Sequence, residues 1–202
     1  MAAFPQFSTD SLLFNCERLI DNGNEFCIKR FNAFHDAEGL TYYLKKQALK
    51  DEKENSVRNY VVKLHGTEIT IAYFTLKAGA IPYTETADNL TFSKNTKLVP
   101  GIELVNIALN DIMLPKIKTL PFKVGEYIFY NIVEKLVLHV ASEIGVKVLY
   151  LFAMNKKLAE YYKTWGFRMI EDDSYNDKLN EEWQSDYSQN CIFMYKPIAE
   201  IV

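Results

Sequence analysis

The segment VKVLYLFAMNKKLAEYYKTWGF, residues 146–167, decides the fold more than any other part of the chain. Its first nine residues are an unbroken apolar run, which is typical of a strand buried on both faces. Asn155 follows as a helix N-cap, because its side-chain oxygen can accept from an amide of the first helical turn. The helix runs through Tyr162 and stops at Gly166. A buried strand followed directly by a short helix is therefore expected.

A longer helix is predicted over residues 125–143, upstream of that strand. Its apolar side chains recur at three- and four-residue spacing and so share one face; they are Ile128, Phe129, Ile132, Val133, Leu136, Val137 and Val140. Gly145 ends this helix. Residues 102–110 (IELVNIALN) are expected to form the strand before it, and residues 191–197 (CIFMYKP) a closing strand.

The first half of the chain predicts further elements. Two β-branched and aromatic runs are separated by Gly66 and Thr67, which predicts a hairpin. The expected elements, in chain order, are a strand at 26–31 (FCIKRF), a polar helix at 36–50 capped by Asp36, a charged loop at 50–56, the hairpin strands at 57–65 and 68–77, and a long loop or short excursion at 78–100. With no internal repeat and no linker, they predict one α/β or α+β domain with a mixed sheet.

Composition and charge limit the classes of function. The 202 residues are 49% hydrophobic, which suffices for a sizeable core. The chain carries 26 acids and 23 bases, so a broadly basic nucleic-acid surface is not expected. Residues 171–187 hold seven of the acids and one base, which leaves 22 bases and 19 acids elsewhere. The small net charge is therefore the sum of two opposed fields.

Several other classes of protein and of site are not expected. The N-terminal residues lack the pattern of a secretory signal, and no apolar stretch is long enough for a membrane span, so a cytoplasmic location is predicted. Cys16, Cys27 and Cys191 are scattered and odd in number, which predicts neither a disulfide framework nor a zinc site. The three histidines are isolated from one another, so no metal site is predicted.

The order of the elements resembles the GNAT acyltransferase superfamily. Its members commonly show Asn, then an aromatic residue about seven positions later, then Gly-Phe, and Asn155, Tyr162 and Gly166-Phe167 fall at those spacings. Residues 101–110 look like the family's central strand, and residues 123–127 look like its pyrophosphate loop. The resemblance implies a GNAT-like acyl-CoA N-acyltransferase fold, α/β (α+β mixed), with a central mixed, mostly antiparallel twisted sheet flanked by helices. We expect a single domain over residues 1–202, with an N-terminal extension at 1–24 and an acidic connection at 171–189 before the last strand.

The resemblance also implies a reaction and a cofactor. The expected activity is transfer of an acetyl group from acetyl-CoA to a primary amine of a small molecule or a protein, directly in a ternary complex, because no motif places a nucleophilic cysteine. Nucleic acid and membrane are not expected partners. The oligomeric state is open, with a homodimer as one option. Two alternatives stay open: an inactive binding or regulatory protein of the same fold, and a toxin-like enzyme that acetylates aminoacyl-tRNA.

Cofactor-binding residues follow from the family's central strand and pyrophosphate loop. The backbone of Ile107 and Leu109 would pair with the pantetheine arm as an added strand does. The pyrophosphate would meet orphan amides and the positive end of a helix dipole at Lys123, Val124, Gly125, Glu126 and Tyr127. Only Gly125 matches the family's usual loop, since Lys123 stands where a glycine is common. A plain helix start with solvated lysines is the alternative.

Two residues are expected to catalyse the transfer. Tyr162 would donate a proton to the leaving thiolate, with Tyr161 as its rival and a purely core role as the alternative. Glu103 would accept the proton of the incoming amine, and an exposed glutamate at a strand end is the alternative. Asn155 is expected to cap its helix, to contact the cofactor, or to do both.

Overall fold

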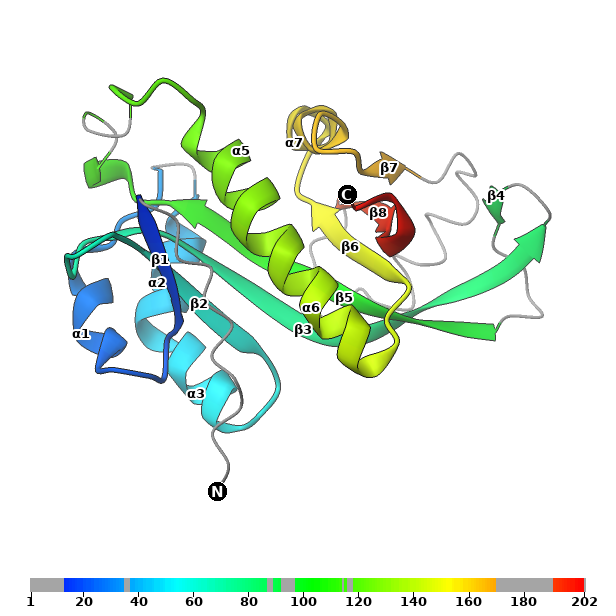
Figure 1. The fold of residues 1–202 in the computed structure, drawn as a ribbon, viewed down its shortest axis with the longest axis horizontal. Coiled ribbons are helices and arrows are strands. Elements are labelled where there is room, and N and C mark those ends of the chain that lie inside the picture. The colour runs from blue at the N-terminus through cyan, green and yellow to red at the C-terminus, as the bar shows by residue number, and fades with distance from the viewer. Residues whose placement is uncertain are drawn as a thin grey trace. The chain divides into compact units, whose positions relative to one another are not determined.

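Two long strands, β3 (Thr70–Thr86) and β5 (Lys97–Leu109), run through both compact units of the protein. The computed structural model describes residues 13–34, 37–86, 89–91, 97–113, 115, 118–169 and 191–201 (Figure 1). Unit 1 comprises Met1–Lys77 and Leu104–Leu136, and unit 2 comprises Ala78–Glu103 and Val137–Val202. The acidic connection predicted at 171–189 lies outside the described residues. No helix in the described ranges is both long and apolar enough to cross a membrane.

The sheet of unit 1 begins with β1 (Phe14–Arg18), which lies within the expected N-terminal extension. β1 pairs antiparallel with β2 (Arg58–Leu64), and β2 pairs antiparallel with β3. The predicted hairpin is therefore confirmed. Its turn needs Gly66, whose φ of 71° lies in the left-handed region. On the other side, β3 neighbours β5.

The strand predicted at residues 26–31 is wrong. Asn24–Cys27 form α1, and Ile28–Arg30 continue it as a 3₁₀ helix, η1. Ile28 and Phe31, three residues apart, are buried, whereas Phe26 is 63% exposed. The burial therefore follows a helical period, although aromatic and β-branched residues favour strands in isolation. The side-chain amide of the buried Asn24 donates to the Arg18 carbonyl at 2.7 Å and ties α1 to the end of β1.

The predicted polar helix is confirmed as two shorter helices, α2 (Glu38–Lys46) and α3 (Ala48–Lys53). Asp36, its expected cap, lies outside the described residues. The charged loop predicted at 50–56 is wrong in its first half, because α3 continues to Lys53. Glu52 is buried and accepts from Arg18 at 2.8 Å and from the Asn59 amide at 3.2 Å, which holds this turn against the sheet.

The helices α1 to α3 cover one face of the unit 1 sheet (Figure 1). Val61 of β2, Tyr73 of β3 and Ala108 of β5 point to this face, since side chains alternate along a strand. The remaining members of this core cluster come from the helices and the segments beside them: Leu19, Ile28, Phe31, Ala33, Leu44 and Ala48.

The prediction of a loop is also wrong for residues 78–86, 89–91 and 97–100, the parts of 78–100 that the structure describes. β3 continues to Thr86, β4 (Asn89–Thr91) pairs antiparallel with it, and β5 begins at Lys97. The segment combines small, polar and turn-forming residues, which read as a loop in isolation. Pairing with neighbouring strands decides the conformation instead, and Ile81 and Val99 are buried in the core of unit 2.

The predicted long helix is confirmed, with a local irregularity. It comprises α5 (Val124–Ile128), a π-helical segment (Phe129–Val133) and α6 (Glu134–Ile144). Six of the predicted apolar residues are buried: Ile128, Phe129, Ile132, Val133, Leu136 and Val137. Gly145 ends the helix with a φ of 71°. The π-helical segment was not anticipated, since the three- and four-residue spacing does not distinguish it.

Unit 2 confirms the decisive segment. β6 (Val148–Ala153) pairs parallel with β5 and antiparallel with β8 (Ile192–Pro197), the predicted closing strand. The helix α7 (Lys156–Lys163) follows β6, and β7 (Arg168–Met169) pairs antiparallel with β8. The resulting strand order, β1-β2-β3-β5-β6-β8-β7, belongs to a mixed and mostly antiparallel sheet flanked by helices, as expected.

Candidate active site

The predicted site residues divide between the two units. The strand residues Ile107 and Leu109 and the helix start at 123–127 belong to unit 1. Glu103, Asn155 and Tyr162 belong to unit 2. Each group is built by its own unit and is described with it.

In unit 1, β5 continues well past its pairing with β6. The parallel register joins Gly101, Ile102 and Glu103 to Val148, Leu149 and Tyr150 and ends there. The strand itself runs on to Leu109. Ile107 and Leu109, both half-buried, lie in this continuation. The register between β5 and β6 does not extend to them, so β6 provides no pairing partner for their backbone groups.

The helix α5 begins with the backbone geometry that an anion site requires. Lys123 is the N-cap residue with extended backbone, and the Tyr127 amide is the first to donate back, to the Lys123 carbonyl at 3.0 Å. The amides of residues 124–126 therefore have no acceptor within the helix, as at every helix start. The Val124 side chain is buried and anchors this turn.

Two side chains at this helix start are already engaged. The Lys123 ammonium lies 2.8 Å from the Glu126 carboxylate, three residues along the exposed side of the turn. The Tyr127 ring packs against Phe122 at 4.8 Å between centroids and against Phe14 of β1 at 5.6 Å. Lys123 thus shares its charge with Glu126, and Tyr127 has a packing role.

In unit 2, Glu103 is buried rather than exposed at a strand end. Only 3% of it is accessible, and its Oε2 accepts from the Tyr150 hydroxyl at 3.5 Å. The two residues are register partners on β5 and β6. Burial, followed by the nearby Glu103 carboxylate, raises the pKa of Tyr150, so the phenol stays protonated and can donate. The exposed alternative for Glu103 is thereby excluded.

Tyr150 is a residue that sequence reasoning missed. Its ring lies across two strand glycines: a Cβ at Gly79 would collide with the Tyr150 hydroxyl, and a Cβ at Gly101 would lie 2.9 Å from its Cε1. An isolated glycine inside a strand marks a close approach, so Gly79 and Gly101 were the available signal. The apolar run that contains Tyr150 reads simply as core.

The helix α7 presents Asn155 and Tyr162. The Asn155 side chain accepts from the Leu158 amide at 2.9 Å, which confirms its capping role. Tyr162 packs against Trp165 and Phe167, at 5.3 and 6.1 Å between centroids. Burial, and to a lesser degree the neighbouring Tyr161, raises the pKa of Tyr162 to about 12. Its phenol is therefore neutral at physiological pH, whereas the rival Tyr161 is 38% exposed.

The Gly-Phe pair has a structural role at the end of α7. The Phe167 amide donates to the Tyr162 carbonyl at 3.2 Å, and the Gly166 amide donates to the Lys163 carbonyl at 3.0 Å. With Gly166 at a φ of 85°, these bonds form a Schellman motif, and the contact between Phe167 and Tyr162 is its usual apolar companion. The motif therefore fixes the Tyr162 ring, which explains the four-residue spacing to Gly166.

No family model and no curated protein matches the chain. Solved structures do match. The structure of AtaTR bound with acetyl-CoA superposes with a TM-score of 0.63 and 18% sequence identity, and the match covers 95% of this chain and 97% of that chain. The structure of a tyrosine-to-phenylalanine mutant of KacT has a TM-score of 0.66 and 17% sequence identity, over 94% of this chain and 97% of that chain. The structure of AtaT complexed with acetyl-methionyl-tRNAfMet has a TM-score of 0.64 and 17% sequence identity, over 93% of this chain and 96% of that chain. AtaT and KacT are GNAT-fold proteins.

The chain has the GNAT fold.

The GNAT fold implies a coenzyme A cofactor. The backbone amides at the start of α5 are suited to bind the pyrophosphate of this cofactor. Three amides without a helical acceptor and the positive end of a long helix suit a diphosphate. One side chain opposes the fit, because the Glu126 carboxylate lies in the same turn and engages Lys123. The fit therefore rests on backbone groups more than on lysine charge.

The GNAT-fold neighbours also bear on partners. AtaT is seen in complex with acetyl-methionyl-tRNAfMet, whereas the sequence of this chain predicts that nucleic acid is an unlikely partner. For metals, the described ranges contain no group of three or more His, Cys, Asp or Glu residues that could hold an ion.

Proposed function

We propose that the chain is an N-acetyltransferase that transfers an acetyl group from acetyl-CoA to a primary amine. The observation that carries the proposal is the continuation of β5 beyond Glu103, where the register with β6 ends. A strand edge of this kind can pair with the amide-bearing pantetheine arm, with Ile107 and Leu109 supplying the backbone groups. A GNAT-fold structure that holds acetyl-CoA and matches nearly the whole chain supports the same assignment.

The pyrophosphate is assigned to the start of α5. The amides of Val124, Gly125 and Glu126 would bind it, with Lys123 and Tyr127 at the two ends of the turn. Asn155 stays in the proposal as a cofactor contact through its side-chain NH₂, because its oxygen already caps α7.

The bound cofactor would supply an acetyl thioester. Glu103 then accepts the proton that the amine must lose, directly or through a water, and Tyr162 donates the proton that the leaving sulfur needs. The amine nitrogen would form the new amide bond as the thioester C–S bond breaks, and the sulfur would leave as the free thiol. Glu103 would then lose its proton to solvent and Tyr162 would regain one, which returns both residues to their starting states. Transfer would be direct, because no motif in the sequence places a nucleophilic cysteine to hold the acetyl group.

A second candidate acceptor is the α-amine of an aminoacyl-tRNA. The AtaT complex with acetyl-methionyl-tRNAfMet favours it, and the surplus of bases outside residues 171–187 is compatible with a phosphate backbone. Small-molecule and protein amines remain the first candidates. A single domain over residues 1–202 and a cytoplasmic location stay predictions from the sequence, and a homodimer stays one option for the oligomeric state.

Calorimetry with acetyl-CoA, followed by turnover assays, tests the proposal. Saturable binding and acetylation of a polyamine, a protein or an aminoacyl-tRNA would support it. Absence of binding at about 1 mM acetyl-CoA would contradict it and favour a GNAT-fold binding or regulatory protein. Salt-dependent tRNA binding, with acetylation of the charged but not the uncharged form, would select the second acceptor.

A further inference from the structure

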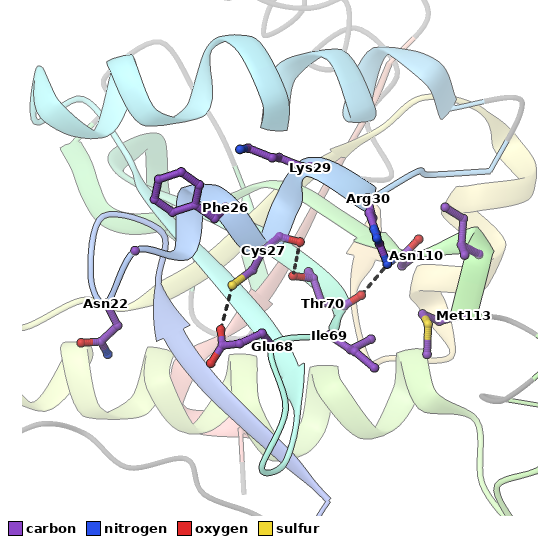
Figure 2. Close-up of a pocket in the computed structure, with 12 residues that line it drawn as sticks. Asn22, Phe26, Cys27, Lys29, Arg30, Glu68, Ile69, Thr70, Asn110 and Met113 are labelled. Atoms are coloured by element: carbon purple, nitrogen blue, oxygen red, sulfur yellow. Dashed lines mark hydrogen bonds between the residues drawn. The ribbon is translucent and has the colours of Figure 1, made fainter.

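Unit 1 contains a pocket that none of the proposed site residues lines. It has a volume of about 710 Å³, within the range of small-ligand sites. α1 and η1, the start of β3 and the residues just after β5 enclose it. Figure 2 shows Phe26 at one end and Met113 at the other, with Cys27, Glu68 and Thr70 between them.

Large apolar side chains are exposed around this pocket. Phe26 is 63% exposed, Ile112 is 62% exposed and Ile69 is 37% exposed, although all three line one concave surface. Scattered exposed apolar residues are ordinary, but a group that shares a pocket is typical of a ligand site. The apolar part of a ligand would cover them.

The acidic side chain of the pocket wall is already engaged. Glu68 lies 3.2 Å from the buried ammonium of Lys63, which also pairs with Glu17 at 3.0 Å. The Cys27 thiol donates to Glu68 at 2.8 Å. These bonds from Cys27 and then Lys63 lower the pKa of Glu68, so it stays ionised and engaged.

The neutral polar groups of the wall are engaged as well. The Thr70 hydroxyl donates to the Cys27 carbonyl at 3.2 Å, and the Asn110 side chain donates to the Thr70 carbonyl at 2.8 Å. Asn110 also accepts from the Asn32 amide at 3.2 Å. The wall therefore offers a neutral polar ligand few partners.

Two adjacent cations remain on the wall, Lys29 and Arg30 of η1. Within the described part of the chain, neither has an ion pair, and the Lys29 ammonium lies 4.6 Å from the centre of the Phe26 ring. Figure 2 shows Lys29 extending toward Phe26, with Arg30 farther along the wall. A guanidinium and an ammonium both suit a phosphate, and an aromatic ring suits a planar base.

We propose that this pocket binds a nucleoside monophosphate, with its phosphate at Lys29 and Arg30 and its base against Phe26 and the apolar wall. The ligand is either a free nucleotide or one nucleotide of an RNA chain, since both present the same groups. The proposal goes beyond acetyl transfer and does not depend on it.

Calorimetry with AMP, adenosine and inorganic phosphate tests the proposal. AMP is expected to bind at least about tenfold more tightly than adenosine or phosphate alone, because both halves of the pocket are then used. The variant Lys29→Gln/Arg30→Gln should lose about tenfold or more in AMP affinity. The matched control, Lys45→Gln/Lys46→Gln on the exposed side of α2, removes the same charge outside the pocket and should bind AMP as the unmodified protein does.

Cysteine alkylation locates the bound ligand. Cys27 lines the pocket and Cys16 does not, and both are half-buried. AMP should slow the alkylation of Cys27 and leave that of Cys16 unchanged. An RNA trinucleotide that binds about tenfold more tightly than AMP would indicate a chain as the source, whereas equal affinity would indicate a free nucleotide. Absence of AMP binding, or equal affinity in both double variants, would overturn the proposal.

Discussion

The Tyr150 hydroxyl lies 3.5 Å from the Glu103 carboxylate, and both residues are almost fully buried in unit 2. A buried carboxylate that acts as a base needs a partner that holds its charge and orientation. Tyr150 suits this role because its phenol stays protonated. The relationship makes Tyr150 a positioning residue for the proposed general base.

Tyr150→Phe is expected to move the acid limb of the pH–rate profile to higher pH. Removal of the hydrogen bond disfavours the charged carboxylate, so the base form appears only at higher pH. Glu103→Gln should move the profile in the same direction and lower its plateau about 10²-fold. In the double variant the second change should add little, because both act through one group. Tyr195→Phe, the β8 partner of Tyr150, is the control, and a profile equal to that of Tyr150→Phe would contradict the role.

Tyr162→Phe is expected to lower kcat about 10²- to 10³-fold with little change in the dissociation constant of acetyl-CoA. The phenol is proposed to act on the leaving sulfur and not in binding. Since its pKa is raised to about 12, ionisation of this phenol should produce no basic limb in the profile below about pH 11. Stopped-flow and calorimetry measure the two quantities. Tyr161→Phe serves as control, and an equal loss of kcat there would exchange the two roles.

Glu126→Gln is expected to tighten acetyl-CoA binding about two- to fivefold. The change releases Lys123 from its ion pair and removes a negative charge from the proposed pyrophosphate site. Titrations at low and moderate salt measure the effect, which should shrink as salt rises. Glu54→Gln breaks the exposed pair with Lys50 on α3 and should leave the affinity unchanged. Weaker binding in Glu126→Gln would contradict the assignment of this turn.

Gly79→Ala is expected to destabilise the protein by about 1–3 kcal/mol, because the new Cβ collides with the Tyr150 hydroxyl. Tyr150→Phe should recover part of this loss, since it removes the colliding atom. Urea denaturation of the two single variants and the double variant measures the coupling. Gly39→Ala, where a Cβ meets nothing within 4 Å, is the control. Additive effects in the double variant would place the strain elsewhere.

Stability is expected to fall as the pH drops below about 4.5. Burial alone would raise the pKa of Glu17, but hydrogen bonds from Lys63 and Asn24 outweigh it and lower that pKa, as Cys27 and Lys63 lower that of Glu68. A lowered pKa in the folded state stabilises it above the unfolded value of 4.5, and the gain is lost as the pH falls through the folded pKa. Urea denaturation at several pH values between about 3 and 7 measures the free energy of unfolding as a function of pH. This dependence should be weaker in Lys63→Met, and an unchanged dependence would contradict the role of Lys63, Glu17 and Glu68.

Regular patterns in the sequence predicted much of the fold. The hairpin around Gly66 and the helix that begins near Gly125 have strong alternation or helical spacing, and the structure confirms both. Residues 26–31 were predicted wrongly because their aromatic content favours a strand, whereas Ile28 and Phe31 are buried three residues apart. The described residues 78–86, 89–91 and 97–100 were predicted wrongly because strand pairing overrides their polar composition.

The candidate site was less predictable than the fold. The residue type and position of Asn155 predict a helix N-cap, and the structure confirms this role. The contact between Tyr150 and Glu103 joins two strands that are far apart in the sequence, so local spacing could not predict it. The engagement of Lys123 by Glu126 follows from their three-residue separation, but only the structure shows that the helix begins there.

The crossing of Tyr150 over two glycines has an evolutionary consequence. Positions 79, 101 and 150 fill one volume, so a larger residue at 79 or 101 alone collides with Tyr150, and a much smaller one at 150 alone leaves a cavity. In homologues a larger residue at position 79 or 101 should therefore occur together with a smaller one at position 150, and the three positions should vary as a group.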